Sequence, residues 1–453
     1  MQNLCKIKLL HFLVFFKTFG RLKMERILMK ELVKWKESKN RKPLIIHGAR
    51  QVGKTWLMTE FGKRYFKDFI YISLDNNPRM KDVFEQDYDV KRIISALKIE
   101  AGRSFSAEET LLIFDEIQEV PKAMASLKYF CENAPEYYIV AAGSLLGMAM
   151  HEGTSFPVGK VDFLFLYPLN YYEFLLASGE NSLAELLESR DFSMINSFCD
   201  KYREYLRKYM YVGGMPEAVK SYTEEGDVTK VRRIQNNLLL YYENDFSKHA
   251  PKEQLPRIQM VWNSIPAQLA KENRKFIYGI IREGARAKDY ETAIQWLSDY
   301  GLIYKSSRVK KPGLPLISYV EFSSFKIYML DVGLLGAKGK LSAKTILEGN
   351  SIFEEFKGAL TEQFIAQELV ANGRELYYYS AENSSAEIDF MVQKEDQCIP
   401  VEVKAAENLR AQSLKSYCHK YNPETAVRTS MSNYRKEDWL VNVPLYAFSE
   451  YMK

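Results

Sequence analysis

The sequence predicts an α/β protein of several domains, the first of which is a parallel sheet flanked by helices. A short apolar run at residues 44–46 leads into a glycine-rich turn that ends at Thr55, where a helical pattern begins. A second apolar run, residues 111–114, ends in the acidic pair Asp115 and Glu116. Apolar strands that alternate with helical patterns are typical of doubly wound sheets, which bind ligands at the carboxyl ends of their strands.

The glycine-rich turn has the spacing G-x-x-x-x-G-K-[ST], which cradles phosphate groups. Its glycines allow a tight turn with inward-facing backbone N–H groups, its lysine reaches the β- and γ-phosphates, and its threonine hydroxyl binds Mg²⁺. A chance match to this pattern next to a strand and a helix is rare on composition alone. The nucleotide-binding residues predicted here are Gly48, Ala49, Arg50, Gln51, Val52, Gly53, Lys54 and Thr55.

The acidic pair is expected to complete a site for ATP and Mg²⁺. Asp115 is placed to hold the metal together with Thr55, and Glu116 is placed to orient the attacking water. Many buried strands end in an acid, but downstream of a phosphate loop the pair is what a nucleotide hydrolase requires. A further buried strand ends at Ser144, which would either sense the γ-phosphate or cap the next turn.

The composition is that of a globular protein with an ample core, at 47% hydrophobic and 27% charged residues. The formal net charge of +5 permits nucleic-acid contact without arguing for it. An apolar run at residues 9–16 is too short to span a bilayer, and we expect residues 1–23 to be an upstream extension before a natural start at Met24. The cysteines are scattered, which indicates a reducing, cytoplasmic environment without disulfides or zinc: Cys5, Cys131, Cys199, Cys398 and Cys418.

Two helical regions are expected after the sheet domain of residues 24–169. Residues 170–250 predict a helical lid, whose many tyrosines fit a helical core better than a base-stacking surface. Residues 251–340 predict a winged helix, with a recognition helix opened by Asp289 and a wing formed by strand 302–304 and the basic turn 305–313. Such a wing could contact phosphate, but the exposed helix positions mix charges and suit a protein partner equally well. The apolar helix positions are Tyr290, Ala293, Ile294 and Leu297.

Residues 341–453 contain a second set of candidate catalytic side chains. Glu402 and Lys404 share one face of a predicted strand, because residues two apart in a strand point the same way. If the preceding strand pairs alongside, Asp389 joins them, and the two carboxylates can bind Mg²⁺ while Lys404 steadies the nucleophile or the phosphate. A preceding helix carries two further acids, Glu362 and Glu368.

Five segments together resemble a large bacterial and archaeal family of AAA-type ATPases with a C-terminal domain of unknown function: GARQVGKT, LLIFDEIQ, AAGS, LYPLNYYEF and YVGGMPEAV. The resemblance runs from about Met24 to the C-terminus and implies an AAA-like P-loop NTPase sheet. Family members generally have arginine where this sequence has Lys160. The resemblance therefore places Lys160 near the γ-phosphate, where lysine keeps the charge of an arginine finger but loses its bidentate fork.

The C-terminal set resembles the core of PD-(D/E)xK nucleases, which implies a restriction-endonuclease-like α/β domain. Asp389, Glu402 and Lys404 match its acidic–acidic–lysine pattern, and Glu362 matches the helical acid, with Glu368 as the second choice. The resemblance implies Asp389, Glu402 and Glu362 as ligands of a second metal. The sequence departs from the pattern at residues 387–388, which replace the proline of the motif, and the same fold also serves as an inert binding module.

Two functions follow from these motifs. The first is an ATP hydrolase that drives or gates a DNA or other nucleic-acid transaction. The second is a nucleotide-dependent switch or scaffold, whose nuclease-like domain is inert and binds a protein partner. The sequence leaves the substrate and the formation of a homo-oligomer open.

Overall fold

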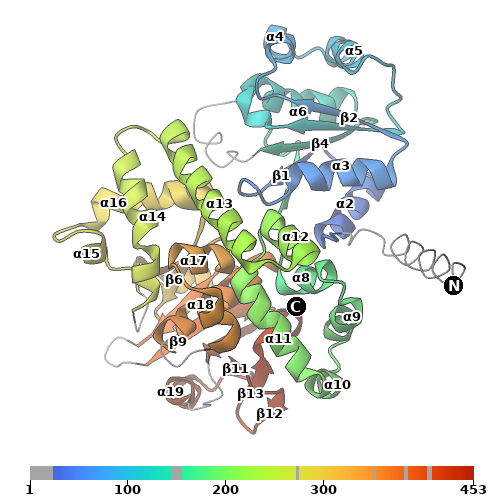
Figure 1. The fold of residues 1–453 in the computed structure, drawn as a ribbon. Coiled ribbons are helices and arrows are strands. Elements are labelled where there is room, and N and C mark those ends of the chain that lie inside the picture. The colour runs from blue at the N-terminus through green and yellow to red at the C-terminus, as the bar shows by residue number, and fades with distance from the viewer. Residues whose placement is uncertain (1–23, 144–155, 272–274, 350–353, 382–385, 406–410) are drawn as a thin grey trace, which may run out of the picture.

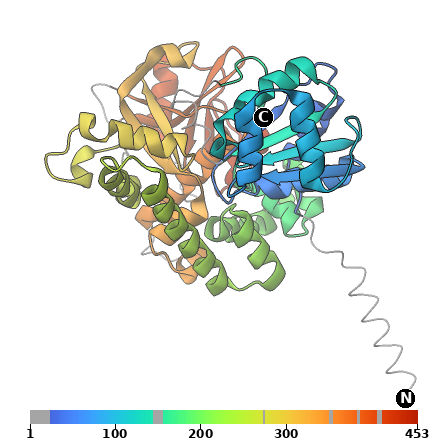
Figure 2. The ribbon, with the colours of Figure 1, turned by 90° about the horizontal axis from the view of Figure 1, so that it is seen from above.

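The computed structural model describes residues 24–143, 156–271, 275–349, 354–381, 386–405 and 411–453. A parallel-sheet domain, coloured blue to teal, lies at the top right of Figure 1, and the C-terminal half, coloured orange to red, lies at the lower left. The green helices of residues 199–249 run along both parts, which Figure 2 shows from above. The architecture is therefore a multidomain α/β fold, as predicted.

In the described residues, five parallel strands form the first sheet in the order β2-β3-β4-β1-β5. Leu44 at the start of β1 pairs with Val140 on β4 and with Asp162 on β5, so the carboxyl ends of these strands meet at one edge. This is the sheet of a P-loop NTPase. The strands are β1 (Leu44–His47), β2 (Asp68–Ser73), β3 (Thr110–Asp115), β4 (Tyr138–Gly143) and β5 (Asp162–Phe165).

Helices cover both faces of this sheet, because successive strand residues point to opposite sides. Leu44 and Ile46 pack in one core with α2 and α3, whereas Ile45 packs in a second core with α4, α5 and α6. The helices are α2 (Leu28–Glu37), α3 (Lys54–Tyr65), α4 (Pro78–Gln86), α5 (Val90–Ala101) and α6 (Pro121–Asn133).

The middle of the chain is helical, as predicted for the lid. Tyr171, Tyr202, Tyr209 and Tyr211 are buried, so these tyrosines form core rather than a surface for stacking bases. The helices are α8 (Tyr171–Ala177), α9 (Asn181–Ser189), α10 (Phe192–Ser197), α11 (Cys199–Val212), α12 (Pro216–Glu225) and α13 (Val228–His249).

Three helices and a hairpin follow, in the region that the sequence predicts as a winged helix. The four predicted apolar positions of α16 are buried, as the spacing requires. Strand β6 is longer than predicted, so that Lys305 and Arg308 lie in the strand and not in the turn, and Arg308 pairs with Glu321 at 2.7 Å. The elements are α14 (Leu255–Leu269), α15 (Tyr278–Ile281), α16 (Ala287–Asp299), β6 (Ile303–Val309) and β7 (Val320–Met329).

The hairpin also belongs to the C-terminal sheet. In the described residues, eight strands form this mixed sheet in the order β12-β13-β11-β10-β9-β8-β6-β7. Its remaining strands are β8 (Tyr377–Ser380), β9 (Glu387–Lys394), β10 (Gln397–Val403), β11 (Val427–Ser430), β12 (Arg435–Lys436) and β13 (Val441–Pro444). The accompanying helices are α17 (Val332–Lys338), α18 (Glu354–Ala371), α19 (Gln412–Tyr421) and α20 (Phe448–Met452). The structure thus does not separate the predicted domains 251–340 and 341–453, because parallel pairing of β6 with β8 joins them.

Candidate nucleotide-binding site

The phosphate loop, residues 48–53, connects β1 to α3 as the motif predicts. Gly53 has φ +93°, a backbone conformation that favours glycine. A Cβ atom on Gly48 would lie 2.3 Å from the carbonyl oxygen of Leu166, so no larger residue fits there without a shift of the backbone. Both glycines of the motif are therefore required by the geometry of the turn.

Lys54 begins α3 and folds back over this loop. Its Nζ donates to the carbonyl oxygens of Gly48 at 2.8 Å and Ala49 at 2.9 Å, and the residue is buried. Burial lowers the pKa of the Lys54 ammonium to about 8, although the carboxylates of Glu116 and Asp115 oppose this shift. The ammonium thus lies inside the loop that the sequence assigns to phosphates.

Thr55 and Asp115 meet beside the loop. The Thr55 hydroxyl donates to Oδ2 of Asp115 at 2.6 Å, and the Tyr71 hydroxyl donates to the same oxygen at 3.0 Å. A hydroxyl and a carboxylate in contact are the hard oxygen donors that Mg²⁺ takes from a protein when phosphate oxygens supply other ligands. The donor set therefore fits the predicted metal, with Thr55 and Asp115 as the residues to hold it.

Glu116 follows directly at the end of β3. Its backbone is left-handed, with φ +51°, and its Oε2 accepts a hydrogen bond from the side-chain amide of Gln118 at 2.7 Å. A left-handed conformation at a residue other than glycine is uncommon and occurs often at active sites. Here it turns the chain at the carboxyl edge of the sheet, and Glu116 lines the same cleft as Lys54 and Thr55.

The cleft has a volume of about 1350 Å³, and its second wall comes from the lid. A Cβ atom on Gly53 would lie 3.5 Å from Cγ of Pro216, so the first turn of α12 rests against the phosphate loop. Pro216 is the first residue of α12, a position that proline favours. The wall residues that the sequence did not reveal are Pro216, Glu217, Lys220, Thr223 and Glu224 on α12, and Lys248 on α13.

Two arginines connect the loop to other elements. Arg26, which is buried, donates to the carbonyl oxygens of Val52 at 3.0 Å and Tyr167 at 2.6 Å and pairs with Glu173 on α8 at 3.1 Å. Arg50 pairs with Asp245 on α13. Neither contact could be found from local spacing, since each partner lies far away in the sequence.

Two predicted nucleotide contacts have other outcomes. Ser144 lies outside the described residues. Lys160 precedes β5, whose Asp162 pairs with Leu44 at the start of β1, so Lys160 lies at the amino edge of the sheet and the phosphate loop lies at the carboxyl edge. Lys160 pairs instead with Glu132 at 2.9 Å. The expectation that Lys160 contacts the γ-phosphate of its own chain is therefore corrected.

The residues of the predicted second metal site make other contacts in this structure. The hairpin forms as expected, and Asp389 accepts a hydrogen bond from the backbone N–H of Val403 at 2.7 Å. Lys404 pairs with Glu402 at 2.6 Å, but Glu362 on α18 pairs with Lys326. Among the described residues, no group of three or more His, Cys, Asp or Glu side chains could hold a metal ion.

Lys326, on β7, was not anticipated. It is fully buried, and its Nζ lies 2.6 Å from Oε1 of Glu387 and 3.7 Å from Oε2 of Glu362. Burial opposes the charge of this ammonium, but the carboxylates of Glu362, Glu387 and Asp389 outweigh burial and raise its pKa. A single lysine in an apolar strand gives no pattern from which this role could be predicted.

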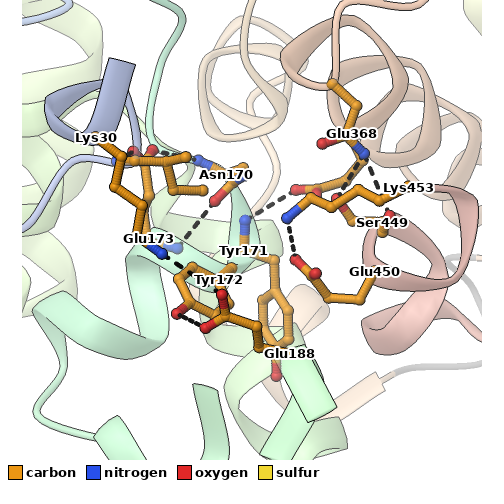
Figure 3. Close-up of polar contacts among 12 residues, drawn as sticks. Lys30, Asn170, Tyr171, Tyr172, Glu173, Glu188, Glu368, Ser449, Glu450 and Lys453 are labelled. Atoms are coloured by element: carbon orange, nitrogen blue, oxygen red, sulfur yellow. Dashed lines mark hydrogen bonds and ion pairs between the residues drawn. The ribbon is translucent and has the colours of Figure 1, made fainter. Parts of the chain in front are cut away.

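Glu368, the alternative to Glu362 as the helical acid of the nuclease pattern, makes a structural contact instead. Its Oε1 accepts a hydrogen bond from the backbone N–H of Tyr171 at 2.8 Å. Mutual hydrogen bonds between Asn170 and Glu173 cap the same first turn of α8. Figure 3 shows Glu368 on α18 reaching the start of α8. Glu368 therefore connects the C-terminal half to the helix that holds Arg26.

No helix in the part of the chain that the structure describes combines the length and the apolar character needed to cross a bilayer.

Three family models match consecutive parts of the chain. Residues 40–175 match an AAA domain, residues 203–345 match a domain of unknown function (DUF8612), and residues 357–448 match another domain of unknown function (DUF4143). The AAA match contains the phosphate loop and the acidic pair. The first unknown domain extends from the lid to α17, across the predicted boundary at residue 250.

Individual relatives are distant. An uncharacterized protein of Methanocaldococcus jannaschii is 23% identical over 385 residues, which are 82% of this chain and 77% of the relative. A Walker-type ATPase of Pyrococcus abyssi has a TM-score of 0.46 at 14% identity, over 70% of this chain and 96% of that one. The AMPPCP-bound DnaA of Aquifex aeolicus has a TM-score of 0.25 at 13% identity, over 60% of this chain and 85% of that one.

The AAA match and the geometry of the cleft agree on the class of the N-terminal half. Residues 40–175 thus match an AAA domain and have the parallel sheet and phosphate loop of a P-loop NTPase.

Proposed function

We propose that the protein binds ATP with Mg²⁺, hydrolyses it, and transmits its nucleotide state to the C-terminal half. The observation that carries the proposal is the convergence of Lys54, the Thr55–Asp115 pair and Glu116 on one cleft. A Mg²⁺ ion bound there would neutralise charge on the β- and γ-phosphates. The loop N–H groups and Lys54 hold the phosphates, Thr55 and Asp115 hold the metal, and Glu116 orients water for attack.

The Gly213–Gly214 turn provides a first route to the C-terminal half. Asp331, at the start of α17, accepts hydrogen bonds from the backbone N–H of Gly214 at 2.6 Å and of Leu334 at 2.9 Å. A Cβ atom on Gly213 would lie 2.2 Å from Asp331, so the turn and the carboxylate are in close contact. Since this turn leads into α12, a movement of α12 at the nucleotide changes the contact with α17.

Helix α13 provides a second route. Near its end Asp245 pairs with Arg50 of the phosphate loop, and Tyr242 donates to the backbone carbonyl of Arg50 at 2.8 Å. Near its start Arg232 donates to the carbonyl oxygen of Leu341 at 2.9 Å, just beyond α17. One rigid helix thus contacts both the nucleotide loop and the C-terminal half.

We propose a nucleic-acid transaction as the process that ATP hydrolysis drives, with Lys310 and Lys311 at the tip of the β6–β7 hairpin as phosphate contacts. Both lysines are exposed, and the mild positive net charge permits this output. The test is binding of single- and double-stranded DNA across a salt series. Lys310→Ala/Lys311→Ala should reduce the slope of log affinity against log salt concentration by about one for each phosphate contact that is lost. The control variant Lys252→Ala/Lys271→Ala, on the α14 side, should leave the salt dependence unchanged.

A second candidate output is a protein partner, which one surface favours. Beside α16 a hollow of about 690 Å³ is lined by Glu291, Asp299, Trp296 and Phe322, and Phe322 is 73% exposed. Acidic and aromatic side chains on the helix that would enter a DNA groove suit a protein better than a phosphate backbone. Absence of salt-dependent DNA binding, with ATPase activity intact, would favour this candidate. Either output requires a compartment that supplies ATP and keeps cysteines reduced, for which we propose the cytoplasm.

A further inference from the structure

Lys326 has an unusual position for a lysine. Its side chain has 0% exposure, although it lies on β7, the last strand in the order of the eight-stranded sheet. Its Nζ lies 5.0 Å from the centroid of the Tyr378 ring, which closes one side of the ammonium. Lysines are almost never fully buried unless they are paired, because removing the charge from water is costly. The partners of Lys326 therefore decide its role.

One partner, Glu362, is an acid of the predicted metal site, and the other, Glu387, lies two residues before the predicted ligand Asp389. Glu387 on β9 lies 2.6 Å and Glu362 on α18 lies 3.7 Å from Nζ. The Tyr328 hydroxyl donates to the same Oε2 of Glu362 at 3.1 Å. The helical acid that the nuclease pattern requires as a metal ligand is thus engaged by a lysine and a tyrosine from β7.

The other two predicted ligands are also engaged. Asp389 accepts the hydrogen bond from the Val403 N–H, and Oε1 of Glu402 pairs with Lys404 at 2.6 Å. Oε2 of Glu402 is buried and has no hydrogen-bond partner among the described residues, so this oxygen could still accept a metal. The donor set therefore does not fit the two-carboxylate metal site that the resemblance implies.

We infer that the Lys326 ammonium is the built-in cation of this acidic cluster, so that the C-terminal half carries an ion-pair group in place of a divalent metal. The cluster neutralises its carboxylates from within, through Lys326 and Lys404. Because Lys326 is fully buried, it cannot approach a substrate and does not replace the catalytic lysine. This inference goes beyond the proposed ATPase function and does not depend on it.

The test compares Mn²⁺ responses of full-length variants without nucleotide. Mn²⁺ should change the Tm of wild type and of Glu402→Gln by the same amount, because wild type has no metal site that depends on Glu402. Lys326→Met should lower the Tm of the C-terminal half by roughly 5 °C or more, because it removes the cation that lies beside Glu362 and Glu387. Mn²⁺ should then restore part of that loss, since the acids no longer have their internal cation. Lys305→Met, an exposed lysine on the neighbouring strand, should show neither effect.

A second variant covers the case in which Lys326→Met does not fold. Lys326→Met/Glu387→Gln removes the carboxylate nearest to the lysine together with the lysine, and it should be more stable than Lys326→Met alone. The inference is overturned if wild type binds Mn²⁺ in a manner that Glu402→Gln abolishes. It is also overturned if wild type cleaves DNA with Mg²⁺ or Mn²⁺ and Glu402→Gln or Asp389→Asn stops the cleavage.

Discussion

The carboxylate of Glu368 accepts a hydrogen bond from the backbone N–H of Tyr171 at 2.8 Å, across 197 residues of sequence. Tyr171 begins α8, and Glu173 on the same helix pairs with Arg26, which donates to the Val52 carbonyl in the phosphate loop. Figure 3 shows the α8 end of this path. A buried polar path therefore runs from α18 in the C-terminal half to the loop that binds phosphate.

The stability of the protein should depend on the protonation of Glu368. Burial raises the pKa of this carboxyl from its usual 4.5 to about 7, against the opposing hydrogen bond from Tyr171. Between pH 4.5 and 7, Glu368 is therefore protonated in the folded protein and ionised in the unfolded chain. The stabilisation is complete below pH 4.5 and is lost as pH rises through 7. Thermal melts from pH 5 to 8 should therefore fall less steeply for Glu368→Gln than for wild type.

Asp331 titrates in the same direction, so only the difference between variants reports on Glu368. Glu204→Gln, on the exposed face of α11, serves as the matched control and should follow wild type. Parallel curves for wild type and Glu368→Gln would contradict a raised pKa at Glu368.

Lys54→Ala should weaken ATP binding by roughly 10- to 100-fold, because it removes charge-assisted hydrogen bonds to the phosphates. Calorimetric titration with ATP and Mg²⁺ measures the change. Lys81→Ala, on the surface of α4, removes the same charge away from the cleft and should bind normally. An unchanged affinity in Lys54→Ala would show that this loop does not bind the nucleotide.

Glu116→Gln should bind ATP but hydrolyse it roughly 100- to 10,000-fold more slowly, because an amide cannot take up the proton of the attacking water. Phosphate release in single-turnover conditions measures the rate. Glu119→Gln, which lines the same cleft, should hydrolyse ATP at nearly the wild-type rate. Similar losses in both variants would mean that general charge in the cleft matters, and not the position of Glu116.

Asp331→Ala should destabilise the protein by several kcal/mol, since the buried N–H groups of Gly214 and Leu334 each lose their acceptor at about 1–3 kcal/mol. Asp331→Asn keeps one oxygen acceptor and should lose less. If the Gly213–Gly214 turn transmits the nucleotide state, hydrogen exchange in α17 and α18 should slow on ATP binding in wild type and change less in Asp331→Asn. Equal protection in both proteins would exclude this turn as the route.

The residues of the site that could be predicted are those that belong to short sequence motifs. The phosphate loop, Thr55 and Asp115 lie where the motif places them, because strand, turn and helix fix them locally. Arg26 and Pro216 could not be found, since their contacts with the loop depend on how separate elements pack. Lys160 was misplaced because a family position does not show which edge of the sheet it occupies. Lys326 was missed because nothing in a strand sequence distinguishes a buried lysine from an exposed one.

The fold of the C-terminal half was predicted in its pieces but not in its assembly. Strands β9 and β10 form the expected hairpin, since a turn joins them directly. The pairing of β6 with β8 joins residues from two predicted domains in parallel, and no local turn announces such a contact.

The pairing of β6 with β8 determines which fragments of the chain can fold. Ser307, Arg308 and Val309 lie opposite Tyr377, Tyr378 and Tyr379, in the interior of the eight-stranded sheet. A fragment that starts at residue 341 would expose the whole edge of β8, and a fragment that ends at 340 would expose the matching edge of β6, which are surfaces prone to aggregation. We therefore expect residues 255–329 and the strands after residue 376 to melt as one cooperative unit. Neither part should be expressed or deleted without the other.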